Sequence, residues 1–224
     1  MAAFRIRRRQ RRVEAALVER FRAVPVSNVS DVMARTEWPA PRLRPMHRGG
    51  ILAGPALTVR TRSGDNLLVH KAIDMAEPGD VVVVDAGGDL TKAIIGEMMA
   101  ARAQKRGLAG LVIYGAVRDS AALRAGDFPV FAAGITYRGP TREGPGEING
   151  PVGLDGMDVA PGDLILGDED GVLCVPFDGA AAILAAAEAN QAAEEKALVA
   201  IRAGTQDKSW VDEALQRLGC VIEP

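Results

Sequence analysis

The sequence predicts an α/β domain with a mixed sheet, helices near the N-terminus and a long helix near the C-terminus. Residues 81–85 and 110–114 are two aliphatic runs of the kind that forms strands buried on both faces. The stretch 92–106 between them has helical spacing and stops before a glycine, so the three segments predict a βαβ unit with parallel strands. The alanine-rich stretch 178–203, which also ends at a glycine, predicts the long helix.

The elements ahead of this unit follow from local spacing. Apolar residues at helical intervals predict the first helix, and residues 27–31 offer N-caps for a second one. Prolines and glycines predict the loop that comes next. In chain order we expect a helix at 11–23, a short helix at 31–34, a loop at 38–50, strands at 51–54 and 56–60, and a helix at 66–74.

Beyond the βαβ unit we expect a short helix at 120–124, a strand at 129–132 and a long ordered loop at 134–153. Glycine, proline and charged residues dominate this loop. Loops of such length inside a domain usually serve function or subunit contacts.

The phrase Pro-Gly-Asp occurs twice, at 78–80 and 161–163, each time before a strand-like run that ends in aspartate and a glycine loop. Two copies are too few for a solenoid. We therefore expect two equivalent tight turns that lead into strands of one domain.

Bulk composition narrows the class of protein. The chain has 224 residues, 48% of them hydrophobic, which is enough for one domain at 13–224 after a basic, flexible N-terminus at 1–12. Cys174 and Cys220 lack the spacing of a zinc site or a disulfide framework, so a cytoplasmic protein is expected. No apolar run reaches membrane-span length. A net charge of -2 and 4% aromatic residues argue against nucleic acid as the main partner.

Six arginines lie in the eight positions from Arg5 to Arg12. This density is compatible with binding to an anionic surface. The favoured interpretation is a loose, solvated terminus that leads into the first helix.

The pair Arg118-Asp119 follows the end of a buried strand, where open α/β sheets generally bind ligands. As an isolated dipeptide it would be an ordinary surface ion pair. At this position, a carboxylate beside a guanidinium suits a divalent cation and a 2-oxo acid. Backbone amides near Gly96 and Met99 offer a second place for an anion, since glycine lets it approach closely.

The ordered motifs of the chain resemble those of RraA-like proteins and class II pyruvate aldolases, over about residues 24–204. The fold that this resemblance implies is the RraA-like swivelling β/β/α single domain. The motifs that carry it are Gly-Asp-Asn at 64–66, Pro-Gly-Asp-Val-Val-Val-Val-Asp at 78–85, Gly-Glu at 96–97, Gly-Leu-Ala-Gly-Leu-Val-Ile-Tyr-Gly-Ala-Val-Arg-Asp at 107–119, Phe-Pro-Val-Phe-Ala at 128–132 and Asp-Glu-Asp-Gly-Val at 168–172.

The resemblance also implies roles for residues. Asp119 is the expected ligand of Mg²⁺ or Mn²⁺, and Glu97 is expected to hydrogen-bond a metal-bound water. Arg118 is expected to hold the pyruvate oxygens. The backbone expected to receive the substrate carboxylate is that of Gly96, Glu97, Met98 and Met99.

Aldolases of the family take a further glutamate from the C-terminal helix of an adjacent subunit, which implies a homotrimer or a hexamer. Glu194 is the expected match, with Glu195 as the alternative. His70, on the apolar face of its helix, is interpreted as a packed structural residue.

The activity implied is that of a metal-dependent carbon-carbon lyase acting on small 2-oxo acids. It would cleave substrates of the 4-hydroxy-4-methyl-2-oxoglutarate (HMG) type to release pyruvate, or decarboxylate oxaloacetate, through a metal-stabilised enolate. The alternative is a non-catalytic regulator that binds ribonuclease E, as RraA does. Ala122 stands where the aldolases carry an acidic residue, and the loop at 139–149 resembles less characterised members, so the substrate stays open.

Overall fold

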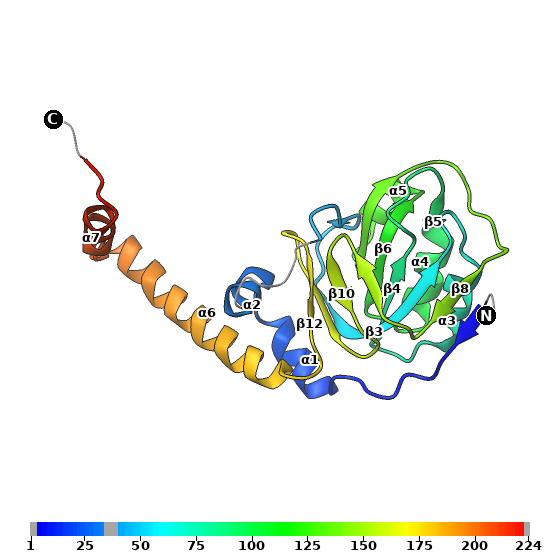
Figure 1. Ribbon diagram of the computed structural model, residues 1–224, viewed down its shortest axis with the longest axis horizontal. Coiled ribbons are helices and arrows are strands. Elements are labelled where there is room, and N and C mark those ends of the chain that lie inside the picture. Colours follow the sequence, from blue (N-terminus) through cyan, green and yellow to red (C-terminus); the bar gives the residue numbers. More distant parts are fainter. Residues whose placement is uncertain (1–3, 34–39, 222–224) are drawn as a thin grey trace.

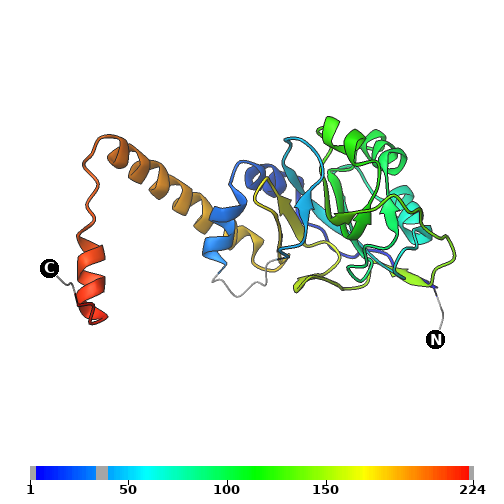
Figure 2. The ribbon, with the colours of Figure 1, turned by 90° about the horizontal axis from the view of Figure 1, so that it is seen from above.

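The computed structural model describes residues 4–33 and 40–221 (Figures 1 and 2). The helices are α1 (Ala15–Arg22), α2 (Val26–Val32), α3 (Leu67–Met75), α4 (Glu97–Lys105), α5 (Ser120–Ala125), α6 (Ala180–Arg202) and α7 (Ser209–Arg217). The strands are β1 (Phe4–Ile6), β2 (Arg44–Pro45), β3 (Leu52–Thr61), β4 (Val81–Asp85), β5 (Ala93–Ile95), β6 (Gly110–Val117), β7 (Val130–Ile135), β8 (Gly146–Ile148), β9 (Val152–Leu154), β10 (Met157–Val159), β11 (Leu164–Gly167) and β12 (Val172–Val175).

Ten strands of the described chain form one mixed sheet, and β9 and β10 form a separate antiparallel pair. The centre of the large sheet is the parallel series β3, β4, β6 and β7. On one side of this series, β8 and β11 pair antiparallel with different parts of β3. The predicted fold class, a mixed α/β sheet with a long C-terminal helix, is confirmed.

The four consecutive valines of β4 explain how the sheet is covered. Val82 and Val84 pack in the cluster that contains the apolar faces of α3 and α4. Val81 and Val83 point to the opposite face, where the β9–β10 hairpin covers them. Successive strand residues alternate between faces, so a strand that is buried on both sides must be apolar throughout.

A third cluster joins α1, α2 and α6 to β11 and β12. The buried residues of α6 are Ala180, Leu184 and Ala187, all in its first half. The rest of α6 projects away from the sheet and leads to α7, as both ribbon views show (Figures 1 and 2). None of the described helices is both long and apolar enough to span a membrane.

Both Pro-Gly-Asp turns have the same internal geometry, as predicted. Asp80 Oδ2 accepts a hydrogen bond of 2.9 Å from the amide of Glu77, and Asp163 Oδ2 accepts one of 2.8 Å from the amide of Ala160. The glycine has a φ of 84° in the first turn and 91° in the second, values that favour glycine. The turns lead into β4 and β11.

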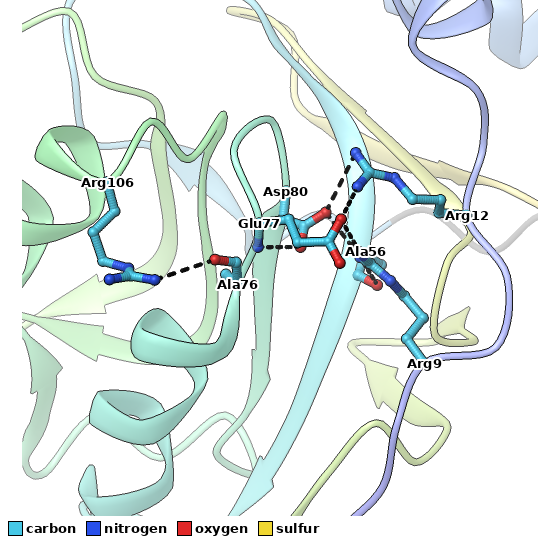
Figure 3. Close-up of polar contacts among 7 residues, drawn as sticks. All are labelled: Arg9, Arg12, Ala56, Ala76, Glu77, Asp80 and Arg106. Carbon is cyan, nitrogen blue, oxygen red and sulfur yellow. Dashed lines mark hydrogen bonds and ion pairs between the residues drawn. The ribbon is translucent and has the colours of Figure 1, made fainter.

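The N-terminal segment differs from the loose terminus that we expected. β1 pairs in parallel with β8, and the following residues run along the sheet. Arg9 Nη1 lies 2.8 Å from Oδ1 of Asp80, whose side chain is 1% exposed. Arg12 contacts Glu77 beside it (Figure 3). Asp80 and Glu77, at the turn preceding β4, therefore bind two arginines that we expected to be exposed to solvent.

Two predicted segments have different secondary structure. The helix expected at 92–106 begins only at α4, because Ile94 and Ile95 form β5, which pairs with β6. Both isoleucines are buried, and β-branched residues suit a strand. The loop expected at 134–153 contains the end of β7, all of β8 and the start of β9, pairings with distant residues that local composition does not show.

Two further boundaries shift around prolines. The strands expected at 51–54 and 56–60 are one strand, β3, in which Pro55 faces β11 and pairing with β4 begins at Ala56. The helix expected at 31–34 is α2, which begins after Pro25 because the φ of proline suits a helix start. Ala34 and Trp38, from the expected helix and loop, lie outside the described residues.

Candidate functional site

Asp119 is the residue at which β6 passes into α5. Its backbone is left-handed, with φ 55° and ψ 38°, a conformation that residues other than glycine adopt infrequently and often at functional sites. The amide of Arg118 donates a hydrogen bond of 3.0 Å to the carbonyl of Ile95, which ties this turn to β5. The turn thus brings the pair to the edge of the sheet next to the start of α4.

The side chains of Arg118 and Asp119 do not form a close ion pair. Arg118 Nε lies 3.7 Å from Asp119 Oδ2, and the two side chains are 44% and 41% exposed. Such a pair contributes only about 0–1 kcal/mol to stability. Oδ2 instead accepts a hydrogen bond of 3.1 Å from the amide of Glu97 in the first turn of α4. A carboxylate at the amino end of a helix lies close to the positive end of the helix dipole.

Gly96 makes this arrangement possible. A Cβ at this position would lie 2.2 Å from Asp119 Oδ2 and 2.9 Å from Arg118 Cγ. Any side chain would displace both groups. The structure therefore brings together four of the residues expected from the sequence: Gly96, Glu97, Arg118 and Asp119.

The backbone expected to receive a carboxylate is only partly available. The amide of Glu97 is bonded to Asp119, and the amide of Met99 lies 3.2 Å from the carbonyl of Gly96. Among described residues, the amide of Met98 has no recorded partner, and the Met98 side chain is 83% exposed. Met98 thus offers a backbone donor in this turn that could bind an anion.

Asn66, the last residue of the Gly-Asp-Asn motif at 64–66, lies beside the site, although the sequence did not predict a role for it. Its Nδ2 donates to the carbonyl of Ile94 at 3.0 Å and contacts the sulfur of Met99 at 3.3 Å. Its buried Oδ1 has no hydrogen-bond partner within the described chain. In the sequence, its position as a polar residue between a glycine turn and an apolar helix was the pattern that could have indicated a role.

Glu194 lies elsewhere in the chain. Its Oε2 accepts a hydrogen bond of 2.7 Å from Asn28 Nδ2, which places it where α6 packs on α2. Figure 1 shows α6 directed away from α4, α5 and β6. Within one chain, the structure does not bring Glu194 to Arg118 and Asp119, and Glu195 is exposed on the same helix.

The donors present suit a hydrated divalent cation. In the part of the chain that the structure describes, Asp119 Oδ1 and the exposed carboxylate of Glu97 have no recorded hydrogen bond or ion pair. The described part of the chain contains no group of three His, Cys, Asp or Glu side chains that could hold a metal ion. Mg²⁺ commonly binds through one or two carboxylates and keeps several waters. Asp119 with Glu97 fits that pattern.

Comparisons with known proteins agree with the motifs. A curated protein of Halalkalibacterium halodurans, named "Putative 4-hydroxy-4-methyl-2-oxoglutarate aldolase", is 40% identical over 182 residues, which are 81% of this chain and 87% of that protein. The structure of the RNA-processing inhibitor RraA from Thermus thermophilis is 35% identical, with a TM-score of 0.62, and the match covers 68% of this chain and 92% of that one.

The fold itself recurs at lower identity. The structure of an uncharacterized protein from Pseudomonas syringae is 23% identical with a TM-score of 0.79, and the match covers 87% of this chain and 96% of that one. The family described as RraA-like, Aldolase/RraA, matches residues 26–174, which include the turn at Asp119 and the start of α4. The chain therefore belongs to the RraA-like family.

Proposed function

We propose that the protein is a cytoplasmic, divalent-metal-dependent carbon-carbon lyase that acts on small 2-oxo acids. Its substrates would be compounds of the HMG type, cleaved by a retro-aldol reaction that releases pyruvate, or oxaloacetate, which loses carbon dioxide through the same enolate. The observation that carries the proposal is the convergence of Glu97, Arg118 and Asp119 around a glycine that leaves room for no side chain.

Each of these groups has a distinct task in such a reaction. Asp119 would bind Mg²⁺ or Mn²⁺, with Glu97 bonded to a water of the metal shell. The cation, when bound, would neutralise negative charge on the oxygens of the substrate. The Arg118 guanidinium, half exposed and without a close partner among described residues, would hold the 2-oxo acid oxygens where that charge develops.

The remaining groups would orient the substrate and accept the proton. The amide of Met98, which has no hydrogen-bond partner among the described residues, lies at the amino end of α4 and would receive the substrate carboxylate. In the aldol case, the carboxylate of Glu97 would accept the proton of the C4 hydroxyl through a water while the C3–C4 bond breaks.

A homotrimer, or a pair of trimers, would complete the site. Glu194 of one subunit would enter the site of its neighbour. Its support is that the second half of α6 is exposed in the single chain and projects beyond the body of the sheet (Figure 2). Glu195 is the alternative on the same helix.

The decisive assay measures pyruvate released from oxaloacetate and from HMG, with Mg²⁺ or Mn²⁺ and then with EDTA. Turnover that requires the metal and stops on chelation is expected. Absence of turnover with both substrates, or turnover that survives EDTA, would contradict the proposal.

A second candidate is a regulator that binds ribonuclease E. The observation in its favour is the 35% identity to the structure described as an RNA-processing inhibitor. Inhibition of purified ribonuclease E by a preparation that lacks lyase activity would support it over the enzyme.

A further inference from the structure

The loop of residues 136–145, between β7 and β8, passes directly beside the Arg118 guanidinium. The amide of Thr136 donates to the carbonyl of Val117 at 2.9 Å, and the amide of Ala93 donates to the carbonyl of Arg138 at 2.8 Å. A Cβ at Gly139 would lie 3.3 Å from Arg118 Nη1. The first half of the loop is therefore one wall of the candidate site.

The second half of this loop is held by Asp65, whose side chain is fully buried. Asp65 Oδ2 accepts hydrogen bonds from the hydroxyl of Thr141 at 3.0 Å and from the amide of Glu143 at 2.6 Å. Asp65 Oδ1 accepts one from the amide of Leu67 at 3.1 Å, at the start of α3. One carboxylate thus joins the loop to the body of the domain.

The backbone around Asp65 repeats this connection. The amide of Thr141 donates to the carbonyl of Gly64 at 2.8 Å, and the amide of Asn66 donates to the carbonyl of Thr141 at 3.1 Å. The Asn66 side chain continues to Ile94 and Met99 beside the start of α4. Residues 64–66 therefore connect two walls of the candidate site, the loop and α4.

The charge on Asp65 depends on these hydrogen bonds. Burial acts to raise the pKa of Asp65, but the bonds from the amides of Glu143 and Leu67, the hydroxyl of Thr141 and the amide of Gly144 outweigh it, so the pKa lies below its ordinary value. The nearest recorded cation is Arg62, whose Nη2 lies 3.7 Å from Oδ2 and whose side chain is 48% exposed. A buried carboxylate satisfied mainly by loop and turn donors resists their loss.

We propose that Asp65 is a positioning residue for the lyase reaction, which holds the loop at 136–145 against Arg118 so that the guanidinium keeps its orientation toward the substrate. This inference rests on the proposed function. Among the described residues, Asp65 forms no hydrogen bond or ion pair with Arg118 or Asp119, so it would act through the loop. It would contribute by keeping Gly139 of the loop close to the Arg118 guanidinium.

The test compares Asp65→Asn with Asp163→Asn. Asparagine has nearly the same shape as aspartate, but its NH₂ group cannot accept the hydrogen bonds that the loop and the turn donate to the carboxylate. Asp163 is the matched control because it is also a buried carboxylate that accepts backbone amides, those of Ala160 and Phe177, but at a turn before β11. Both variants lose hydrogen bonds to a buried carboxylate, and only one of these carboxylates anchors the loop.

For Asp65→Asn we expect amide hydrogen exchange at Thr141 and Glu143 to accelerate by about 10-fold or more. We also expect kcat/KM for oxaloacetate to fall by about 10- to 100-fold, mainly through a higher KM, because a misplaced binding group costs this much. Asp163→Asn should lower the midpoint of urea unfolding and leave kcat/KM within about 2-fold of the wild-type value.

Two results would overturn the inference. One is an Asp65→Asn protein whose loop exchanges faster while kcat/KM stays at the wild-type value. The other is an equal loss of kcat/KM in both variants, which would indicate a general loss of stability. If the wild-type protein shows no turnover at all, the proposed function fails, and the positioning role of Asp65 fails with it. If the wild type does turn over, the comparison of the two variants tests Asp65 alone.

Discussion

The amide of Glu97 and the Oδ2 atom of Asp119, separated by 3.1 Å, connect the first turn of α4 to the turn after β6. The two residues are 22 positions apart in the chain. Their contact places a carboxylate at the amino end of a helix, and its second oxygen has no hydrogen-bond partner among the described residues.

Gly96→Ala is expected to abolish most of the lyase activity. The new Cβ would lie 2.2 Å from Asp119 Oδ2, so the carboxylate must move away from the Glu97 amide. A displacement of a catalytic group by about 1 Å lowers the reaction rate on the order of 100-fold. The control is Gly126→Ala, where the nearest atom would be 3.8 Å away and an alanine fits. Equal kcat/KM for the two variants would contradict the crowding argument.

Asp119→Ala is expected to remove metal-dependent turnover while the protein stays folded. The matched control is Asp74→Ala, because Asp74 is also an aspartate with a 41% exposed side chain near an arginine, Arg102, at 2.6 Å. Steady-state assays with Mg²⁺ and circular dichroism measure the two effects separately. An Asp119→Ala protein that is active, or one that unfolds, would favour a structural ion pair.

Mixed oligomers test whether Glu194 acts across subunits. Asp119→Ala and Glu194→Gln homo-oligomers are each expected to be inactive. In a trimer assembled from equal amounts of both, about a quarter of the sites would combine an intact Asp119 with an intact Glu194 from the neighbour. Activity should therefore reappear on mixing after subunit exchange. If Glu194 acts within its own chain, mixing restores nothing. If Glu194 has no role, the Glu194→Gln homo-oligomer is already active before mixing.

Arg9→Gln is expected to lower the free energy of unfolding by about 3 kcal/mol, because it leaves the buried carboxylate of Asp80 without its closest cation. The side chains of Arg9 and Asp80 are 10% and 1% exposed. Arg8→Gln is the control, since Arg8 is exposed and has no recorded ion pair with described residues. Urea unfolding of both variants gives the comparison. Equal stability of the two would mean that the N-terminal segment contributes little.

The lowered pKa of His70 should make the free energy of unfolding depend on pH. Burial lowers its pKa, and the nearby charges of Arg142 and Arg102 lower it further against the opposing effect of Asp74. The folded state thus favours the neutral ring. Its contribution to stability is complete above the unfolded pKa and is lost as pH falls through the folded pKa. From about pH 7 to pH 5 the free energy of unfolding should decrease, and more steeply than in His70→Gln. Equal slopes would exclude this contribution.

The sequence predicted those parts of the fold that depend on local pattern. The valines of β4, the alanines of α6 and the paired Pro-Gly-Asp turns all produced the elements expected of them. Ile94 and Ile95 were assigned to a helix, because only the partner strand β6 shows that they form β5. Short strands that pair over long distances leave little local signal.

The candidate site was predictable as a set of residue types and only partly as geometry. The resemblance named Glu97, Arg118 and Asp119, and the structure brings them together. The sequence could not show that Asp119 itself occupies the amide of Glu97, since that contact depends on the left-handed turn after β6. The buried anchor at Asp65 was likewise hidden, because its partners lie 76 and 78 positions further along the chain.

The uniform valines of β4 also leave open which residue of the strand faces which neighbour. A slip by one position would exchange one valine for another on each face, so hydrophobicity scarcely opposes it. The alignment of Ala56 with Val81 and of Arg60 with Asp85 must instead be specified at the two ends of the strand. Asp80, bonded to Arg9, marks one end, and Asp85, 3.7 Å from Arg60, marks the other. The interior of β4 thus stabilises the sheet through apolar packing, and the two aspartates at its ends determine its register.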